Sequence, residues 1–302
     1  MTNKILVSAL CTGTLLLTAC GGGGSSNESY TTTSTVDYNK SETIDSISLP
    51  IVSLTSIKYN PLYFISNLAD DTFYYADKLN NNLSPAVSCE SGTFKKNTDG
   101  SVVLNNCKNI KINDNSYNFT ISGKIYSNYT VNEDKSVINN DLSLTNFIIK
   151  YNDGEIENYN GKVVKTYTFN EATKNLKVDY NINNLIFTWS DNTNKESYNL
   201  TDYLLTETHN VGTYTTTKAQ AKGRLQATID NQKFSVNFDS NREYDLYSSS
   251  PNIAVINIQD TNNSKNAITI KNTSNGKVLI SAFANGTSVS GYPKTVNWDY
   301  FE

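Results

Sequence analysis

Alternation of apolar and polar residues constrains this chain more than any other feature. Phe119, Ile121 and Ile125 alternate with Thr120 and Ser122, and similar stretches follow as far as the C-terminus. Period two is the signature of a strand with one buried face. The chain also holds 20 tyrosines and many asparagines, which favour strands and turns respectively. Most connections are short, which favours antiparallel neighbours. We therefore expect a mainly β fold with one large twisted or curved antiparallel sheet, a meander that could also take the form of a half-barrel or a sandwich.

An internal repeat carries a distinctive break in this alternation. Residues 141–153 match residues 179–191, thirty-eight positions later. In both copies the apolar positions step by three instead of two, which reverses the apolar face of a strand. One extra residue in each strand would restore the face, so we expect a β-bulge or a sharp bend at Thr145–Asn146 and at Asn183–Asn184. The alternative is a pair of strands that are buried on both faces. The repeat is typical of a duplicated hairpin unit within one sheet.

One substantial helix is predicted before the strands begin. Asn60 is a good N-cap and Pro61 is tolerated at the first helical position. Apolar residues then fall near one helical face, which predicts a helix over about 61–80. The preceding segment, 44–59, has apolar spacings of both two and three. These spacings do not distinguish a strand from a helix there.

Cys89 and Cys107 flank a predicted hairpin. The turn signal Asn97-Thr98-Asp99-Gly100 lies midway between them. Folding back at this turn brings the two cysteines opposite each other, within the distance that a disulfide needs. Free thiols and a metal pair are the alternatives. Two cysteines this far apart, in a chain with one histidine, do not form a convincing zinc site. An even pair fits an oxidising compartment such as the periplasm.

Further strands are expected through the C-terminal half of the chain. If the chain has two domains, the Ser- and Asn-rich segment near 240–252 is the best boundary. The expected strands cover about 163–170, 174–189, 196–208, 222–230, 232–239, 253–259, 266–272, 277–283 and 294–301.

The N-terminus has the pattern of a secretory signal. Lys4 is followed by a mostly apolar run that is too short to span a membrane, and residues 1–19 end in small side chains. The last residues, Leu17-Thr18-Ala19-Cys20, resemble the lipobox of bacterial lipoproteins. The resemblance implies cleavage before Cys20 and lipidation of its thiol, and Gly21 after it implies an outer-membrane destination. The alternative is an ordinary signal peptide followed by a chance cysteine.

The mature chain is expected to have a tether and a body. Residues 20–43, rich in Gly, Ser and Thr, are predicted to be the lipidated cysteine and a flexible tether, and residues 44–302 a β-rich domain. This arrangement resembles β-rich lipoproteins of Gram-negative bacteria, a resemblance that implies no particular activity. The net charge of −4 argues against a nucleic-acid partner, which would require a basic face.

Few residues suggest chemistry. His209 is the only histidine, so a triad would depend on it alone, and a strand end is its simpler interpretation. Asp153, Glu155 and Glu157 alternate and could hold Ca²⁺ or act as paired carboxylates, although a solvated turn explains them equally well. Tyr151, Tyr159, Tyr167, Tyr180 and Trp189 could form an aromatic platform for sugars or lipid, with Tyr151, Tyr180 and Trp189 as the ligand candidates and core packing as the alternative. We expect no catalytic site, cofactor or metal.

These observations favour one function class over two others. We expect a non-enzymatic lipoprotein, held in the outer membrane by its N-terminal lipid and facing the periplasm or the cell surface. Its role would be binding of a glycan, lipid or envelope protein, or support of the envelope structure. One alternative is a lipid-handling module with a concave apolar face. The other is a carbohydrate-binding adhesin or a glycan-active enzyme.

Overall fold

The computed structural model of the chain describes residues 35–79, 87–112, 115–211, 216–245, 250–273 and 276–301. Cys20 and the predicted signal peptide lie outside these residues. Two α-helices come first, α1 (Ser41–Leu54) and α2 (Pro61–Leu79), and a 3₁₀ helix, η2 (Trp298–Phe301), comes last. Between them lie β1 (Val87–Ser88), β2 (Ser91–Lys96), β3 (Val102–Lys108), β4 (Lys111–Ile112), β5 (Asn115–Ser116), β6 (Phe119–Val131), β7 (Val137–Tyr151), β8 (Ile156–Asn170), β9 (Asn175–Ser190), β10 (Lys195–Asn210), β11 (Thr216–Ile229), β12 (Gln232–Asp245), β13 (Ile253–Asp260), β14 (Ala267–Asn272), β15 (Lys277–Ala284), β16 (Thr287–Ser288) and β17 (Lys294–Asn297).

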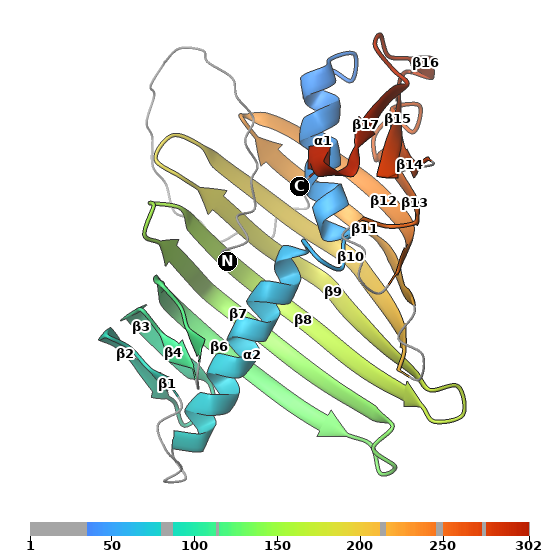
Figure 1. The fold of residues 1–302 in the computed structure, drawn as a ribbon. Helices are drawn as coiled ribbons and strands as arrows, with labels where there is room; N and C mark the ends of the chain where they lie inside the picture. The colour runs from blue at the N-terminus through green and yellow to red at the C-terminus, as the bar shows by residue number, and fades with distance from the viewer. Residues whose placement is uncertain are drawn as a thin grey trace.

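One antiparallel sheet of 14 strands dominates the fold, which confirms the predicted fold class. Its strands follow in the order β16-β15-β14-β13-β12-β11-β10-β9-β8-β7-β6-β3-β2, and β17 pairs with β15. The sheet is open and twisted (Figure 1). Strands β12 and β13, which lie on either side of the predicted boundary near 240–252, pair with each other in this sheet. A small separate sheet contains β1, β4 and β5.

Both helices lie on the same face of the large sheet, which we call the inner face (Figure 1). Helix α2 crosses β6 to β10, where Phe64 meets Phe119 of β6 and Tyr63 meets Tyr180 of β9. Helix α1 lies over the C-terminal strands, where Arg242 of β12 donates to the Val52 carbonyl. Large apolar residues of α1, among them Ile44, Ile47 and Ile51, are fully buried against the sheet.

The helix predicted over 61–80 forms as α2, but a second helix, α1, precedes it. Two features of the sequence hid this helix. The apolar spacing of 44–59 does not distinguish a helix from a strand, and Pro50 inside α1 lacks the N–H for a helical hydrogen bond. The predicted tether is also too long. Tyr38 is buried and the Thr35 N–H donates to the Lys233 carbonyl at 2.9 Å, so the body begins before residue 44.

Asn60 starts α2 as expected and also joins the helix to the sheet. Its side-chain oxygen accepts the Leu62 N–H at 3.0 Å, the interaction of an N-cap. Its side-chain nitrogen donates to the Leu54 carbonyl at 2.7 Å and to the Tyr203 hydroxyl at 2.9 Å. These three hydrogen bonds connect the end of α1, the start of α2 and strand β10 through one side chain, and that side chain is buried.

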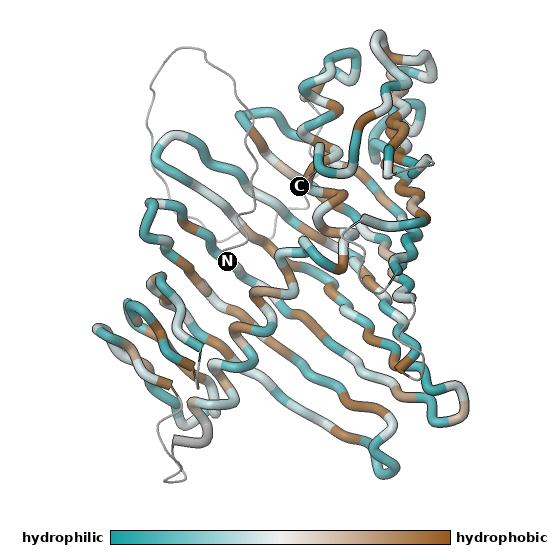
Figure 2. Tube along the Cα trace, viewed as in Figure 1, coloured by the Kyte–Doolittle hydropathy of each residue, from teal (hydrophilic) through white to brown (hydrophobic). Residues whose placement is uncertain are grey.

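Burial along the strands follows the alternation of the sequence. Apolar residues recur at alternate positions of each strand (Figure 2), and the buried ones face the helices. Val163 and Lys165 of β8, for example, are buried, whereas Lys162 between Gly161 and Val163 is exposed. The outer face carries mostly Asn, Thr, Ser, Lys and Asp. Most side chains at these outward-facing positions are exposed or half-buried.

The pairing register shifts at both predicted bulges. Thr145 and Asn146 of β7 lie opposite Asn160 alone, and β9 has one more residue than β8 between Asn181 and Leu185. The neighbouring strands β6 and β8 have no bulge and carry Gly123 and Gly161 at this level, which are also thirty-eight residues apart. A similar shift at β10 lies beside Gly223 of β11. A row of bulges therefore crosses the sheet, and bulges bend strands and increase their twist.

Two further predictions concern the ends of the sheet. The hairpin of β2 and β3 forms as expected, and Cys89 and Cys107 form a disulfide with their Cα atoms 5.1 Å apart. The last expected strand, 294–301, is too long. Only Lys294–Asn297 pairs with β15, and Trp298–Phe301 turn into η2, where Trp298 packs into the core.

Candidate functional site

The aromatic ligand candidates of the sequence divide between two places on the inner face. Tyr151 and Trp189 both lie next to Glu157, because the Tyr151 hydroxyl donates to that carboxylate at 3.2 Å and Trp189 is its cross-strand partner. Tyr180 lies apart from them, beneath α2, with its ring 4.8 Å from the ring of Tyr63. The three residues therefore do not form one platform.

An acidic–aromatic cluster surrounds Glu157 at the end of the sheet where the β7–β8 and β9–β10 turns lie. Trp189 of β9 pairs on one side with Glu157 of β8 and on the other with Glu196 of β10. The next cross-strand row is fully aromatic, and its three rings stack at centroid distances of 5.9 and 4.6 Å. The cluster consists of Tyr151, Glu157, Tyr159, Phe187, Trp189, Glu196 and Tyr198.

Tyrosine hydroxyls satisfy both carboxylates of the cluster. Glu157 accepts from Tyr159 at 3.1 Å in addition to Tyr151, and Glu196 accepts a short hydrogen bond from Tyr198. Burial raises the pKa of the Glu157 carboxyl, and the hydrogen bonds from the two tyrosines oppose this shift. Burial likewise raises the pKa of Glu196 against the bond from Tyr198. With 8% and 6% exposure, these groups are poorly placed to bind a ligand from solution.

Sequence reasoning found only part of this cluster. Glu157, Tyr151 and Trp189 are candidates in the sequence, whereas Glu196 and Tyr198 are not. Glu196 and Tyr198 join the cluster because of the pairing register of β9 with β8 and β10. This register becomes known only when the three strands are aligned in the sheet. Asp153 and Glu155 lie in the turn, where the Asp153 carboxylate accepts the Glu155 N–H at 3.3 Å. The three alternating carboxylates therefore do not act together.

His209 lies at the end of β10, as the sequence suggests, and is not isolated. Its Nε2 lies 3.1 Å from Glu207 Oε2, and its Nδ1 lies 3.1 Å from the hydroxyl oxygen of Thr217. Glu207 is buried, and its second oxygen has no hydrogen-bond partner in the described part of the chain. The carboxylate of Glu207 and the hydroxyl of Thr217 therefore lie against the two ring nitrogens of His209.

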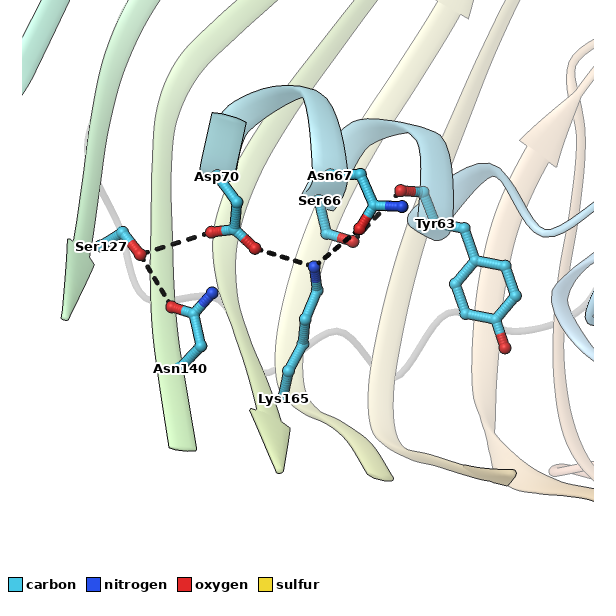
Figure 3. A network of polar contacts seen from close by, with 7 residues as sticks. All are labelled: Tyr63, Ser66, Asn67, Asp70, Ser127, Asn140 and Lys165. Atoms are coloured by element: carbon cyan, nitrogen blue, oxygen red, sulfur yellow. Dashed lines mark hydrogen bonds and ion pairs between the residues drawn. The ribbon is translucent and has the colours of Figure 1, made fainter. Parts of the chain in front are cut away.

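A buried network of hydrogen bonds and one ion pair connects α2 to strands of the sheet (Figure 3). Lys165 of β8 donates to Asp70 at 2.8 Å and to Asn67 at 3.1 Å, both on α2. The Ser127 hydroxyl lies 3.3 Å from the other Asp70 oxygen and 2.7 Å from the Asn140 side-chain oxygen. Lys165 is 1% exposed, so this ion pair is desolvated. Loss of one partner from such a pair is strongly destabilising, because it leaves an uncompensated buried charge.

The outer face carries an open groove of about 370 Å³ over β12, β13 and β14. Two cross-strand rows of outward-facing side chains line it, Asp239–Asn257–Thr269 and Asn237–Gln259–Ala267, and all of them except Ala267 are polar. The small side chain of Ala267 leaves room at the end of the second row. Asn257 donates to Asp239 at 3.1 Å and Gln259 to the Ser264 carbonyl at 3.0 Å, whereas the Asn237 side chain has no partner within the described ranges. The groove can therefore offer amide donors and acceptors to a polar ligand.

Three further observations concern metal sites, membrane-spanning helices and similarity to known proteins. No three His, Cys, Asp or Glu side chains come together in a metal-binding arrangement within the described ranges. Neither described α-helix combines the length and the apolar character needed to cross a bilayer. The chain matches no protein-family model, no curated protein and no solved structure.

Proposed function

We propose that the chain is a lipid-anchored envelope protein that binds a polar, hydroxyl-rich ligand of the saccharide class without transforming it. The N-terminal pattern ending at Cys20 supports the anchor. The open sheet supports the binding role, since most outward-facing side chains of its strands are exposed or half-buried while two helices pack on the other face. A site built on paired strands keeps its side chains in fixed positions, which lowers the entropic cost of binding.

The outer-face groove is the observation that carries the proposal. It is an open groove of about 370 Å³ that a ligand could occupy while keeping one side in water. Asn237, Asp239, Asn257 and Gln259 are exposed there and present amide and carboxylate groups in a regular grid. Sugars offer many hydroxyls, each both donor and acceptor, and such a grid complements them. Water-mediated contacts would complete the interaction.

The lipid-handling alternative requires unfilled apolar space between the helices and the sheet. Ile47 and Ile51 of α1 and Leu62 and Leu68 of α2 are at most 2% exposed, so the helix side chains between helices and sheet are packed. Interiors packed in this way have little space for an acyl chain. We therefore place the ligand on the outer face and not between the sheet and the helices.

Isothermal titration calorimetry with maltohexaose, cellohexaose and chitohexaose would test the binding role. We expect at least one oligosaccharide to bind, and Asp239→Ala and Asn257→Ala to weaken its binding at least tenfold. Asp141→Ala is the matched control, because Asp141 lies on the outer face of β7, away from the groove, and pairs with Lys162. No binding of any of the three sugars, or binding that Asp239→Ala leaves intact, would refute the saccharide site.

Labelling with radioactive palmitate would test the anchor separately. We expect the wild-type chain to incorporate the label and Cys20→Ser to lose it. The matched control is Cys11→Ser, which changes a cysteine of the predicted signal peptide. Equal labelling of Cys20→Ser and the wild type would remove the lipoprotein part of the proposal without affecting the groove.

A further inference from the structure

A small cavity lies where the end of α1, strand β12 and the C-terminal helix η2 meet. Its volume is about 20 Å³, which is enough for one water molecule or one ion of similar size. Ser56, Arg242, Tyr244 and Trp298 contribute to its lining. Neither the proposed saccharide groove nor the acidic–aromatic cluster shares any of these residues.

Arg242 is a buried cation without a paired anion among the described residues. It is 2% exposed, and its Nη2 donates to the Val52 carbonyl at 2.7 Å and to the Thr55 hydroxyl. Its Nη1 donates to the Tyr244 hydroxyl at 3.2 Å, and the guanidinium lies 5.5 Å from the Trp298 ring centre. No described carboxylate pairs with it. Its Nε–H has no acceptor in the described part of the chain.

The carboxylate nearest along the same cross-strand row does not neutralise Arg242. Glu207 of β10 occupies that row, but Ala219 of β11 separates the two residues. Glu207 interacts instead with His209 at 3.1 Å. Among the described residues, the charge of Arg242 is therefore balanced only by neutral oxygens and an aromatic face. Burial of a charge in this way is costly unless a counter-charge is present.

Three further donors around the cavity lack acceptors within the described ranges. The Trp298 indole N–H is buried and has no partner among the described residues. The Tyr244 hydroxyl accepts from Arg242, which leaves its own hydrogen free to donate. Ser56 Oγ accepts the N–H groups of Lys58 and Tyr59 at 3.1 and 3.2 Å, so its hydrogen is also free. Buried donors almost always have acceptors in native proteins.

We infer that this cavity binds a small monovalent anion of the size of chloride or bromide. A halide accepts several hydrogen bonds at once and supplies the missing negative charge beside Arg242. A water molecule would satisfy some donors but would leave the charge uncompensated. The bound anion would connect the C-terminal end of α1 to β12 and η2, so the three elements would separate less readily when it is present.

Thermal unfolding in sodium chloride and in sodium gluconate, at the same ionic strength, tests the inference. Gluconate is too large for the cavity. We expect chloride to raise the Tm by about 2–5 °C relative to gluconate. Trp298→Phe keeps an aromatic ring but removes the N–H donor, so this variant should lose most of the chloride-dependent shift. Trp189→Phe, at the other tryptophan of the chain, should keep all of it.

Crystals soaked in sodium bromide give an independent answer. An anomalous peak between Trp298 Nε1 and Arg242 would support the site, and Arg242→Lys should weaken it while the fold is retained. Equal Tm values in chloride and gluconate, a full chloride shift in Trp298→Phe, or density for water alone in the bromide-soaked cavity would each overturn the inference. Failure of oligosaccharides to bind the outer groove would leave this result unaffected.

Discussion

Gly161 of β8 lies directly against the bulged backbone of Asn184 in β9. A Cβ atom at Gly161 would be 2.6 Å from the Asn184 carbonyl oxygen, and the Gly161 φ of +147° is one that other residues rarely adopt. Gly123 and Asn146 repeat the arrangement in the preceding hairpin, where the same substitution would also meet the backbone of the bulge. The sheet can bend along this row because glycine leaves space for the adjacent bulge.

Replacement of Gly161 by alanine should therefore destabilise the protein strongly. The new methyl group would clash with backbone atoms that no rotamer change can move. We expect a loss of about 2–4 kcal/mol in the free energy of unfolding, measured with urea. Gly276→Ala is the control, because its φ is also positive but no atom lies within 4 Å of the position that its new methyl group would occupy. Its cost should be about 1 kcal/mol, and similar losses in the two variants would show that the clash at the bulge is unimportant.

Removal of Lys165 alone should be costly, because it leaves Asp70 as an unpaired buried charge. For Lys165→Met we expect a loss of about 3–5 kcal/mol, and the double variant with Asp70→Leu should recover most of it. Lys162 provides the matched control on the same strand. Its pair with Asp141 is also 2.8 Å long but is exposed to solvent, so Lys162→Met should cost less than about 1 kcal/mol. A double-mutant cycle by chemical denaturation that gave no coupling between Lys165 and Asp70 would contradict this account.

Glu157→Gln should stabilise the protein at neutral pH and have less effect in acid. Burial raises the pKa of Glu157 in the folded state, so the folded chain binds this proton more tightly than the unfolded chain. Stability is then greatest below the unfolded pKa of about 4.3 and falls as pH rises towards the folded pKa. Glutamine keeps an acceptor for Tyr151 and Tyr159 but has no charge to bury.

The Tm difference between Glu157→Gln and the wild type, followed from pH 4 to pH 7, measures this effect. It should grow with pH. Glu133→Gln, in the exposed turn between β6 and β7, should show no such growth. A Glu157→Gln variant that was less stable than the wild type at pH 7 would contradict this prediction. It would mean that interactions of the charged carboxylate outweigh the cost of burying its charge.

Loss of the disulfide should lower stability by a moderate amount. Cys89 and Cys107 are 18 residues apart, and closing a loop of this size stabilises the folded state by about 3 kcal/mol. The Cys89→Ala/Cys107→Ala variant should therefore have a lower urea midpoint. Reductant should lower the wild-type midpoint to the same value and leave the variant unchanged. If reductant had no effect on the wild type, the bond would not contribute to stability.

Local patterns were sufficient for much of the fold. Period-two alternation predicted the strands, the step of three predicted bulges at Thr145–Asn146 and Asn183–Asn184, and the turn at Asn97–Gly100 predicted the disulfide hairpin. Each of these features depends on residues that are close together in the sequence. Helix α1 is the exception, because its helical conformation is stabilised by burial of Ile44, Ile47 and Ile51 against strands that follow much later.

The sequence alone determined that this chain forms bent, antiparallel strands with one disulfide-linked hairpin, since side-chain alternation and turn chemistry act over a few residues. Only the tertiary structure decided which polar groups meet. Arg242 contacts Val52 and Thr55 at the end of α1 across nearly two hundred residues, Lys165 pairs with Asp70 of α2, and Glu196 joins Glu157 through the register of β9. No pattern along the chain encodes these contacts, because each depends on where a helix settles on the sheet or on how three strands align.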